Sequence, residues 1–273
     1  MNKIKGYASW LWGQLQGWST ASYLLVGLSA GFNVGVTITA GVYDWVSILT
    51  MIGGFVGVLC VVAISNAKRI NGYLGAVNAI MLMFLAYHAG NFYDIILQLC
   101  YFFVLDMAVI LGHTWGAGFK PKSIIVGKIT KSNWNKLASW KAFAKWRVFL
   151  MVVAVLVGSF VVFYYFGSYI HHPRVVVDGL ATSLGLTGAI LCAKGYKTQY
   201  FYWTAQGLFS VILWGITYNQ GAANPVLLGT YSLYLLNDVI GVFDSEWFGF
   251  KAKRIAKKQA KLDAELLDSE LAE

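Results

Sequence analysis

The fold is decided by residues 45–65, which read WVSILTMIGGFVGVLCVVAIS and carry no charged side chain. As a helix, a run of this length crosses a hydrocarbon core of about 30 Å. Comparable apolar runs lie at residues 71–89, 92–113, 147–168, 175–193, 199–217 and 223–243. No segment shows the alternation over ~10 residues that is typical of a membrane barrel. The pattern predicts an all-α polytopic membrane protein.

The composition agrees with a surface that faces lipid. Charged residues make up 12% of the chain, against about 25% in a typical soluble domain, and apolar residues make up 58%. Residues 1–19 place Lys3 and Lys5 before an apolar helical face, which predicts an amphipathic segment in the membrane interface. Residues 20–42 are moderately apolar and either form an extra N-terminal span or lie shallowly in the membrane.

Basic residues gather on one side of the predicted spans. If the loop after residue 65 lies in the cytoplasm, the cytoplasmic loops and tail hold 18 of the 21 Lys and Arg residues. A crossing by residues 20–42 adds Lys3 and Lys5 to that side. Cytoplasmic loops carry such an excess, so we predict that both termini are cytoplasmic. The net charge of +9 is thereby explained by topology, and nucleic acid is not expected as a partner. The basic cytoplasmic linker and the charged cytoplasmic tail occupy residues 114–146 and 244–273.

The sequence offers no chemistry typical of an enzyme. It contains no phosphate-binding glycine loop, no HExxH and no G-x-S-x-G motif. Its three cysteines, Cys60, Cys100 and Cys192, lie inside apolar segments without CxxC spacing, so we interpret them as small buried hydrophobes. An intramembrane enzyme would need a metal cluster, or a nucleophile with a base, at membrane depth. We therefore expect no enzymatic activity, no cofactor and no metal.

An internal repeat relates the two halves of the chain. Residues 50–71 align with residues 178–199 at an offset of 128, and polar residues such as Asn78 and Gln206 recur at matching depths. This predicts a 3+1+3 helix bundle with parallel repeats, in which a substrate site lies between the repeats near mid-depth. The two three-helix repeats occupy residues 45–113 and 175–243, and a connecting span occupies residues 147–168.

Polar and aromatic side chains recur at helical spacing inside the spans. Gln98, Phe102 and Asp106 follow one another every four residues, which places them on one face of an α-helix. A single buried amide can simply hold helices together, but polar groups in hydrocarbon usually face the bundle interior. The candidate substrate-binding residues are Asn78, Gln98, Phe102, Asp106, Trp203, Gln206, Trp214, Thr230, Tyr234 and Asn237.

These side chains indicate a class of ligand. Amides pair with hydroxyl and amide groups, and Trp and Tyr faces suit a flat ring. Together they predict a small-molecule substrate with a ring and a polar sugar, like a nucleoside or a vitamin. Asp106 leaves proton coupling open, although a facilitator without ion coupling is the simpler expectation.

Over roughly residues 45–245, the chain resembles the PnuC family of bacterial vitamin transporters. The resemblance rests on Gly75-x-x-Asn78, Gln98 followed by the aromatic run 101–103, Asp178, Trp203 and the pair Leu236-Asn237. The chain departs from the family pattern Trp-x-x-Trp-x-x-x-Asn, because it has Tyr200, Trp203 and then Gln206 one residue before the position of the asparagine.

The resemblance implies a seven-span core similar to that of the sugar-transporting SWEET proteins, in the inner membrane of a bacterium. It implies facilitated diffusion of nicotinamide riboside, or of a closely related nucleoside-like vitamin precursor, with trapping by a cytosolic kinase. It also implies a homotrimer. Relatives that carry thiamine, riboflavin or deoxynucleosides leave those substrates open as alternatives. A non-transporting membrane scaffold, which recruits partners through its basic linker and tail, is the alternative from another class.

Overall fold

The computed structural model describes residues 2–112, 115, 119–122, 140–221, 223 and 225–248. Almost all of these residues lie in helices or in the short turns between them, and one isolated β-bridge pairs Lys122 with Tyr196. Most of the predicted basic linker, and the tail beyond residue 248, lie outside the described residues.

The helices follow one another with short connections. They are α1 (Asn2–Leu15), α2 (Thr20–Ala40), α3 (Trp45–Ser65), α4 (Ile70–His88), α5 (Phe92–Cys100), η1 (Tyr101–Asp106), α6 (Met107–Leu111), α8 (Trp140–Tyr169), α9 (Val175–Ala193), α10 (Gln199–Asn219) and α11 (Pro225–Asp244). Helices α5, η1 and α6 form one continuous span, in which η1 is a π-helix.

Capping residues explain where the first long helices begin and end. The Ser19 hydroxyl accepts a hydrogen bond of 3.1 Å from the backbone N–H of Ser22 at the start of α2. Gly41, with φ of 65°, ends α2 in the left-handed conformation that glycine adopts without strain. The Asp44 carboxylate then accepts a bond of 2.7 Å from the Ser47 N–H at the start of α3. Turn residues in the sequence thus separate two adjacent apolar runs.

Seven helices in the described part of the chain are long and apolar enough to cross a membrane. They are α2, α3, α4, the span Phe92–Leu111, the Val148–Tyr169 part of α8, α9 and α11. This agrees with the predicted all-α polytopic membrane protein. Helix α10 has the length of a span, 21 residues, but is more polar than the other seven. Its buried polar side chains are Gln199, Gln206, Ser210 and Thr217.

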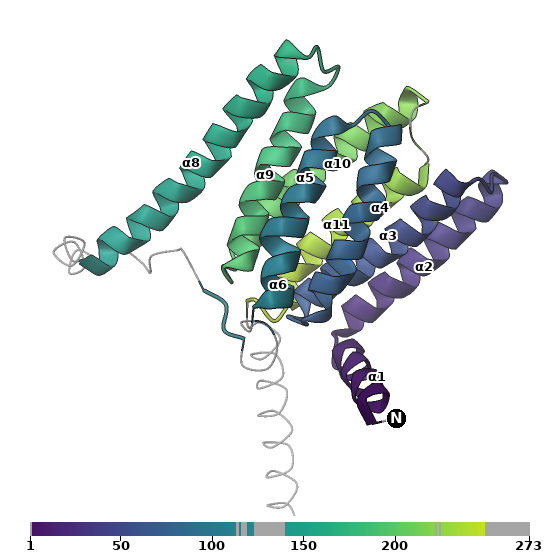
Figure 1. Cartoon of the computed structure of the whole chain (residues 1–273), viewed down its shortest axis with the longest axis horizontal. Coiled ribbons are helices and arrows are strands. Elements are labelled where there is room, and N and C mark those ends of the chain that lie inside the picture. Colours follow the sequence, from purple (N-terminus) through teal and green to yellow (C-terminus); the bar gives the residue numbers. More distant parts are fainter. Residues whose placement is uncertain are drawn as a thin grey trace, which may run out of the picture.

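The long helices form two triplets flanked by single helices. The first triplet is α3, α4 and the span from α5 to α6, and the second is α9, α10 and α11. Within each triplet, successive helices pack against each other. The triplets meet where α3 packs on α11 and where α5 packs on α9. Figure 1 shows α8 on one side of the bundle, against α9, and α2 on the other side, against α3 and α11.

The main hydrophobic core lies between the two triplets. It joins Leu105 and Val109 from the first triplet to Tyr200 and Trp203 from the second. Cys60 and Cys192 are free thiols buried in the same cluster, as predicted, whereas the free thiol of Cys100 is only half-buried. Close packing across this boundary fixes the side chains around a cavity that lies between the triplets.

Candidate functional site

A cavity of about 80 Å³ lies between the two triplets. Its walls come from α3, α4, α5 and η1 on one side and from α10 and α11 on the other. The polar lining residues are Gln98, Asp106, Gln206 and Asp238. The aromatic lining residues are Tyr101, Trp203, Tyr231 and Tyr234. The cavity thus combines amides, carboxyls and aromatic rings at the position between the halves where the internal repeat predicts a site.

The π-helix η1 determines which side chains of its segment reach the cavity. Hydrogen bonds in a π-helix join residues five apart, so its turn is wider than an α-helical turn. Tyr101 and Asp106 are separated by five residues, and both line the cavity. Phe102 does not line it and packs edge-on against Phe103, with ring centroids 5.1 Å apart. Of the predicted common face, Gln98 and Asp106 therefore reach the cavity and Phe102 does not.

Several lining side chains lie directly against helical glycines, among them those of Asp106 and Trp203. A Cβ atom on Gly75 of α4 would overlap the carboxyl group of Asp106. A Cβ atom on Gly188 of α9 would overlap the indole ring of Trp203. Small residues let a neighbouring helix approach closely in membrane proteins. Here they allow a carboxyl group and an indole ring to lie against the backbone of the adjacent helix.

A buried carboxyl group positions two other lining residues. Asp94, in the first turn of α5, is 3% exposed. It accepts hydrogen bonds from the Tyr231 hydroxyl at 2.7 Å and from the Gln98 amide at 3.1 Å. Because Gln98 and Tyr231 belong to different triplets, Asp94 joins the triplets beside the cavity.

Two buried atoms of the lining have no hydrogen-bond partner within the described part of the chain. They are Oδ2 of Asp106 and Nε1 of Trp203. Buried polar atoms are normally paired, so this acceptor and this donor are available to a bound molecule. No Lys, Arg or His occurs among the described residues that line the cavity.

The structure brings part of the predicted site together. Gln98, Asp106, Trp203, Gln206 and Tyr234 line the cavity. The other predicted residues lie outside the lining.

Asn78 and Trp214 lie behind the lining. The Asn78 amide donates to the Tyr234 hydroxyl at 3.5 Å, and the Trp214 ring stacks on Tyr231 with centroids 5.3 Å apart. These two residues support lining side chains rather than forming the wall themselves.

Thr230 and Asn237 make helix–helix contacts away from the lining. Thr230 donates to the Asn33 side chain of α2 at 3.4 Å, and Asn237 accepts from the Ser65 hydroxyl of α3 at 3.2 Å. Polar residues often hold membrane helices together in this way.

The predicted set omitted three lining residues, Tyr101, Tyr231 and Asp238. A signal for two of them was present, because spacings of three and four residues place Tyr231, Tyr234 and Asp238 on one face of α11. Tyr101 also had such a signal, because it follows Gln98 by three residues and i to i+3 spacing keeps two side chains on one helical face.

A polar cluster joins the triplets at the end of the bundle far from α1 (Figure 1). Arg174 donates hydrogen bonds to the side chains of two residues. Asn91 directly precedes α5, and Thr217 lies in α10. His172 lies 3.4 Å from Asp178. Burial and the nearby Arg174 charge lower the pKa of His172. Its Nδ1 accepts a hydrogen bond of 3.2 Å from the Arg174 backbone N–H, as a neutral ring can.

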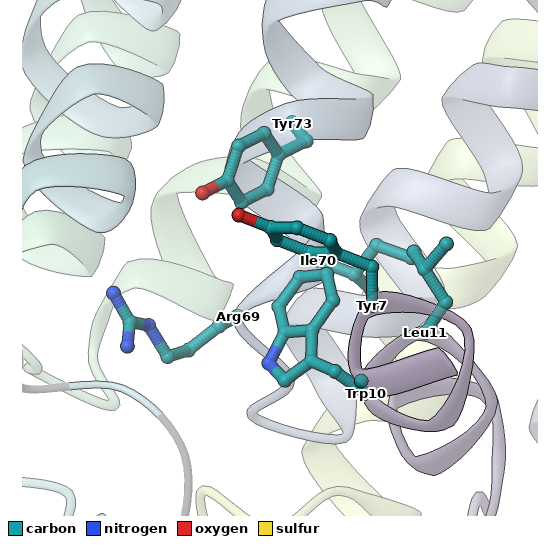
Figure 2. A pocket seen from close by; sticks show the side chains of 7 residues that line it. Tyr7, Trp10, Leu11, Arg69, Ile70 and Tyr73 are labelled. Carbon is teal, nitrogen blue, oxygen red and sulfur yellow. The ribbon is translucent and has the colours of Figure 1, made fainter. Parts of the chain in front are cut away.

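A second hollow, of about 820 Å³, lies between α1 and the start of α4. Figure 2 shows Tyr7, Trp10 and Tyr73 gathered there, with the Arg69 guanidinium pointing away from the rings. Arg69 donates to the carbonyl of Gly112 at 3.1 Å, beyond the end of α6. The described residues that line this second hollow include no amide or carboxyl side chain. Aromatic residues in such a place are typical of a membrane interface, so the cavity between the triplets is the better candidate site.

Comparisons with known proteins agree on one family. The profile of a family described as "Nicotinamide mononucleotide transporter" matches residues 47–248. A curated Haemophilus influenzae protein, "Nicotinamide riboside transporter PnuC", is 26% identical over 200 residues, which cover 72% of this chain and 78% of that protein. A crystal structure of "the Vitamin B3 transporter PnuC" aligns with a TM-score of 0.66 at 20% identity, covering 90% of this chain and 98% of the other. The last likeness concerns the fold alone.

Proposed function

This chain belongs to the nicotinamide mononucleotide transporter family, which includes PnuC, and we propose that it carries nicotinamide riboside or a closely related nucleoside-like vitamin precursor. It is a membrane transporter of the vitamin and nucleoside class. The observation that carries the substrate proposal is the cavity between the triplets, with its aromatic, amide and carboxyl lining. We infer facilitated diffusion as the mode of transport.

The lining suits the two parts of a nucleoside. Trp203 and the neighbouring tyrosine rings offer flat apolar faces for a base-like ring. Gln98 and Gln206 offer both donors and acceptors for ribose hydroxyls or a carboxamide. The unpaired Nε1 donor of Trp203 adds a hydrogen bond for an acceptor on the substrate.

The lining favours a riboside over a mononucleotide. A phosphate group is normally bound by Arg, Lys or the N-terminus of a helix. The described lining residues include no Arg or Lys, and they include two carboxyl groups that would repel a phosphate. We therefore infer a substrate without phosphate.

The packing supports the 3+1+3 arrangement with parallel repeats. The first helix of each triplet packs on the last span of the other, as expected for two copies related by an axis along the membrane normal. The repeat pairs Asn71 with Gln199, and both are fully buried. Helix α8 packs mainly on α9, which suits a connecting span.

We infer alternating access from the size of the cavity and the contacts around it. Its volume of about 80 Å³ is below the range of about 300–1,000 Å³ of small-molecule sites. A ring with a sugar needs the triplets to move apart. The hydrogen bonds from Tyr231 to Asp94 and from Arg174 to Asn91 join the triplets and would break in that movement.

The setting of the transporter is part of the same proposal. The Haemophilus influenzae relative supports a bacterial inner membrane, and the one-sided basic charge supports a cytoplasmic C-terminus. We propose a homotrimer, and a cytosolic kinase that traps the imported substrate as a phosphate ester.

Uptake by proteoliposomes tests the function. Purified protein should equilibrate labelled nicotinamide riboside without an ion gradient, and should do so faster than thiamine, riboflavin or a deoxynucleoside. Trp203→Ala should weaken binding by about tenfold, because stacking on a flat ring contributes about 1–3 kcal/mol. Phe103→Ala is the matched control, because Phe103 is 65% exposed and lies outside the lining.

Three results would contradict parts of the proposal. Unchanged binding by Trp203→Ala would remove the cavity as the site. Uptake that requires a proton gradient would exclude facilitated diffusion. Preference for one of the other vitamins would change the substrate.

A further inference from the structure

Two carboxyl groups face the same small cavity from opposite triplets. Asp106 is the last residue of η1, and Asp238 lies in the second half of α11. Asp106 is only 2% exposed and Asp238 only 5%. The amide and aromatic residues around them explain recognition of a ring and a sugar, but they do not explain two acids.

These acids have no basic partner among the described residues of the cavity. The described lining contains no Lys, Arg or His, and Oδ2 of Asp106 receives no hydrogen bond from the described residues. A buried carboxylate without a counter-charge is unfavourable, and acids inside a membrane protein usually serve a function. Gly75 leaves the Asp106 carboxyl room to remain at this position.

We propose that Asp106 and Asp238 recognise the positive charge of the substrate ring. The inference rests on the proposed function and makes it more specific: the transporter selects cationic, N-glycosylated heteroaromatic rings over neutral rings of the same size. Nicotinamide riboside has such a ring, because the pyridinium nitrogen that bears the ribose carries a permanent positive charge.

The aromatic walls favour the same ligand. A cation near the face of Trp or Tyr is attracted by the electrons of the ring, and Trp203 and three tyrosines line this cavity. A neutral ring would stack on these residues but leave both carboxyl groups without a counter-charge. Buried groups left unpaired by the wrong ligand are a strong source of selectivity.

The test compares two forms of one ligand. Nicotinamide riboside is cationic, and its dihydro form is neutral and of nearly the same size. Calorimetry on the purified full-length chain should show the cationic form binding at least about tenfold more tightly, as expected for a charge-assisted contact. Asp106→Asn and Asp238→Asn should each remove at least about tenfold of the affinity for the cation and leave binding of the neutral form within about threefold.

Asp44→Asn is the matched control. It makes the same chemical change far from the cavity, and asparagine caps a helix as well as aspartate does. It should bind both forms as the wild type does. Thermal unfolding of each variant shows whether it is folded, and the wild-type comparison needs no substitution at all.

The outcomes are distinct. Equal binding of both forms by the wild type overturns the charge recognition and leaves the transport function standing. A preference for the cation that survives in both Asn variants also overturns it. Failure of the folded wild type to bind either form overturns the proposed substrate, and the inference with it.

Discussion

The position of the Trp203 indole depends on the absence of a side chain on the neighbouring helix. Gly188 of α9 faces the ring so closely that a methyl group would overlap it. Another glycine of the same helix, Gly179, has room to spare: its Cβ would lie 3.7 Å from Phe163, which is ordinary contact. The two glycines therefore form a matched pair in one helix, and we expect substitution by alanine to be costly at Gly188 and harmless at Gly179.

Gly188→Ala should displace Trp203 and weaken binding of nicotinamide riboside by about tenfold, since overpacking of this kind costs about 1–3 kcal/mol. Gly179→Ala should bind as the wild type does and unfold at the same temperature or slightly higher, because Ala favours a helix by about 0.5–1 kcal/mol. Calorimetry and thermal unfolding measure the two effects. Equal behaviour of the two variants would show that Trp203 does not depend on Gly188.

Among the secondary-structure elements, η1 is the one that α-helical spacing does not describe. Its i to i+5 bonding accommodates an additional residue between two regular helices, so that Tyr101 and Asp106 share a face. Regular helices leave no such room, because removal of one residue turns everything beyond it by about 100°.

Deletion of Val104 from η1 should therefore be tolerated. The segment can return to α-helical bonding, with Tyr101 and Asp106 then four residues apart and still on one face. Deletion of the exposed Leu208 from the regular helix α10 should instead abolish binding. Circular dichroism, size-exclusion chromatography and calorimetry compare the two variants. Loss of folding on deletion of Val104 would contradict this account of η1.

The difference between regular α-helices and the π-helix η1 explains much of how far the sequence predicts the structure. The apolar run at residues 45–65 coincides with α3, because it lacks charge and Asp44 caps its start. Trp203 and Gln206 line the cavity, because α10 is a regular helix and their spacing of three residues keeps them on one face. Phe102 does not, because the π-helix changes the spacing. Thr230 and Asn237 do not, because spacing alone does not distinguish a cavity from a contact with another helix.

At the scale of the whole molecule, the charge pattern and the number of crossings depend on each other. Seven segments including α2 qualify as spans, which is an odd number, so both termini lie on one side only if α10 crosses as well. Length and apolar character identify α2 as a span, whereas α10 is too polar to be identified in this way.

Reporter fusions should place both termini in the cytoplasm. A fluorescent protein that matures only in the cytoplasm should be bright at the C-terminus, and alkaline phosphatase fused there should be inactive. Alkaline phosphatase inserted after His171, in the connection between α8 and α9, should be active. Arg174 is the basic residue on that side, which is why the positive-inside rule predicts this result. Active phosphatase both after His171 and at the C-terminus would exclude a crossing by α10, because α9, α10 and α11 separate the two sites.

The polarity of α10 also bears on how the protein is made. The translocon releases a nascent helix into lipid according to its hydrophobicity. Helix α10 carries Gln199, Gln206 and Thr217, and these side chains are buried only once its neighbours are in place. We expect α10 to leave the translocon together with α11, as a hairpin, after both have been synthesised. A mutation that disrupts α11 would then first impair membrane insertion, and α10 would be left outside the bilayer.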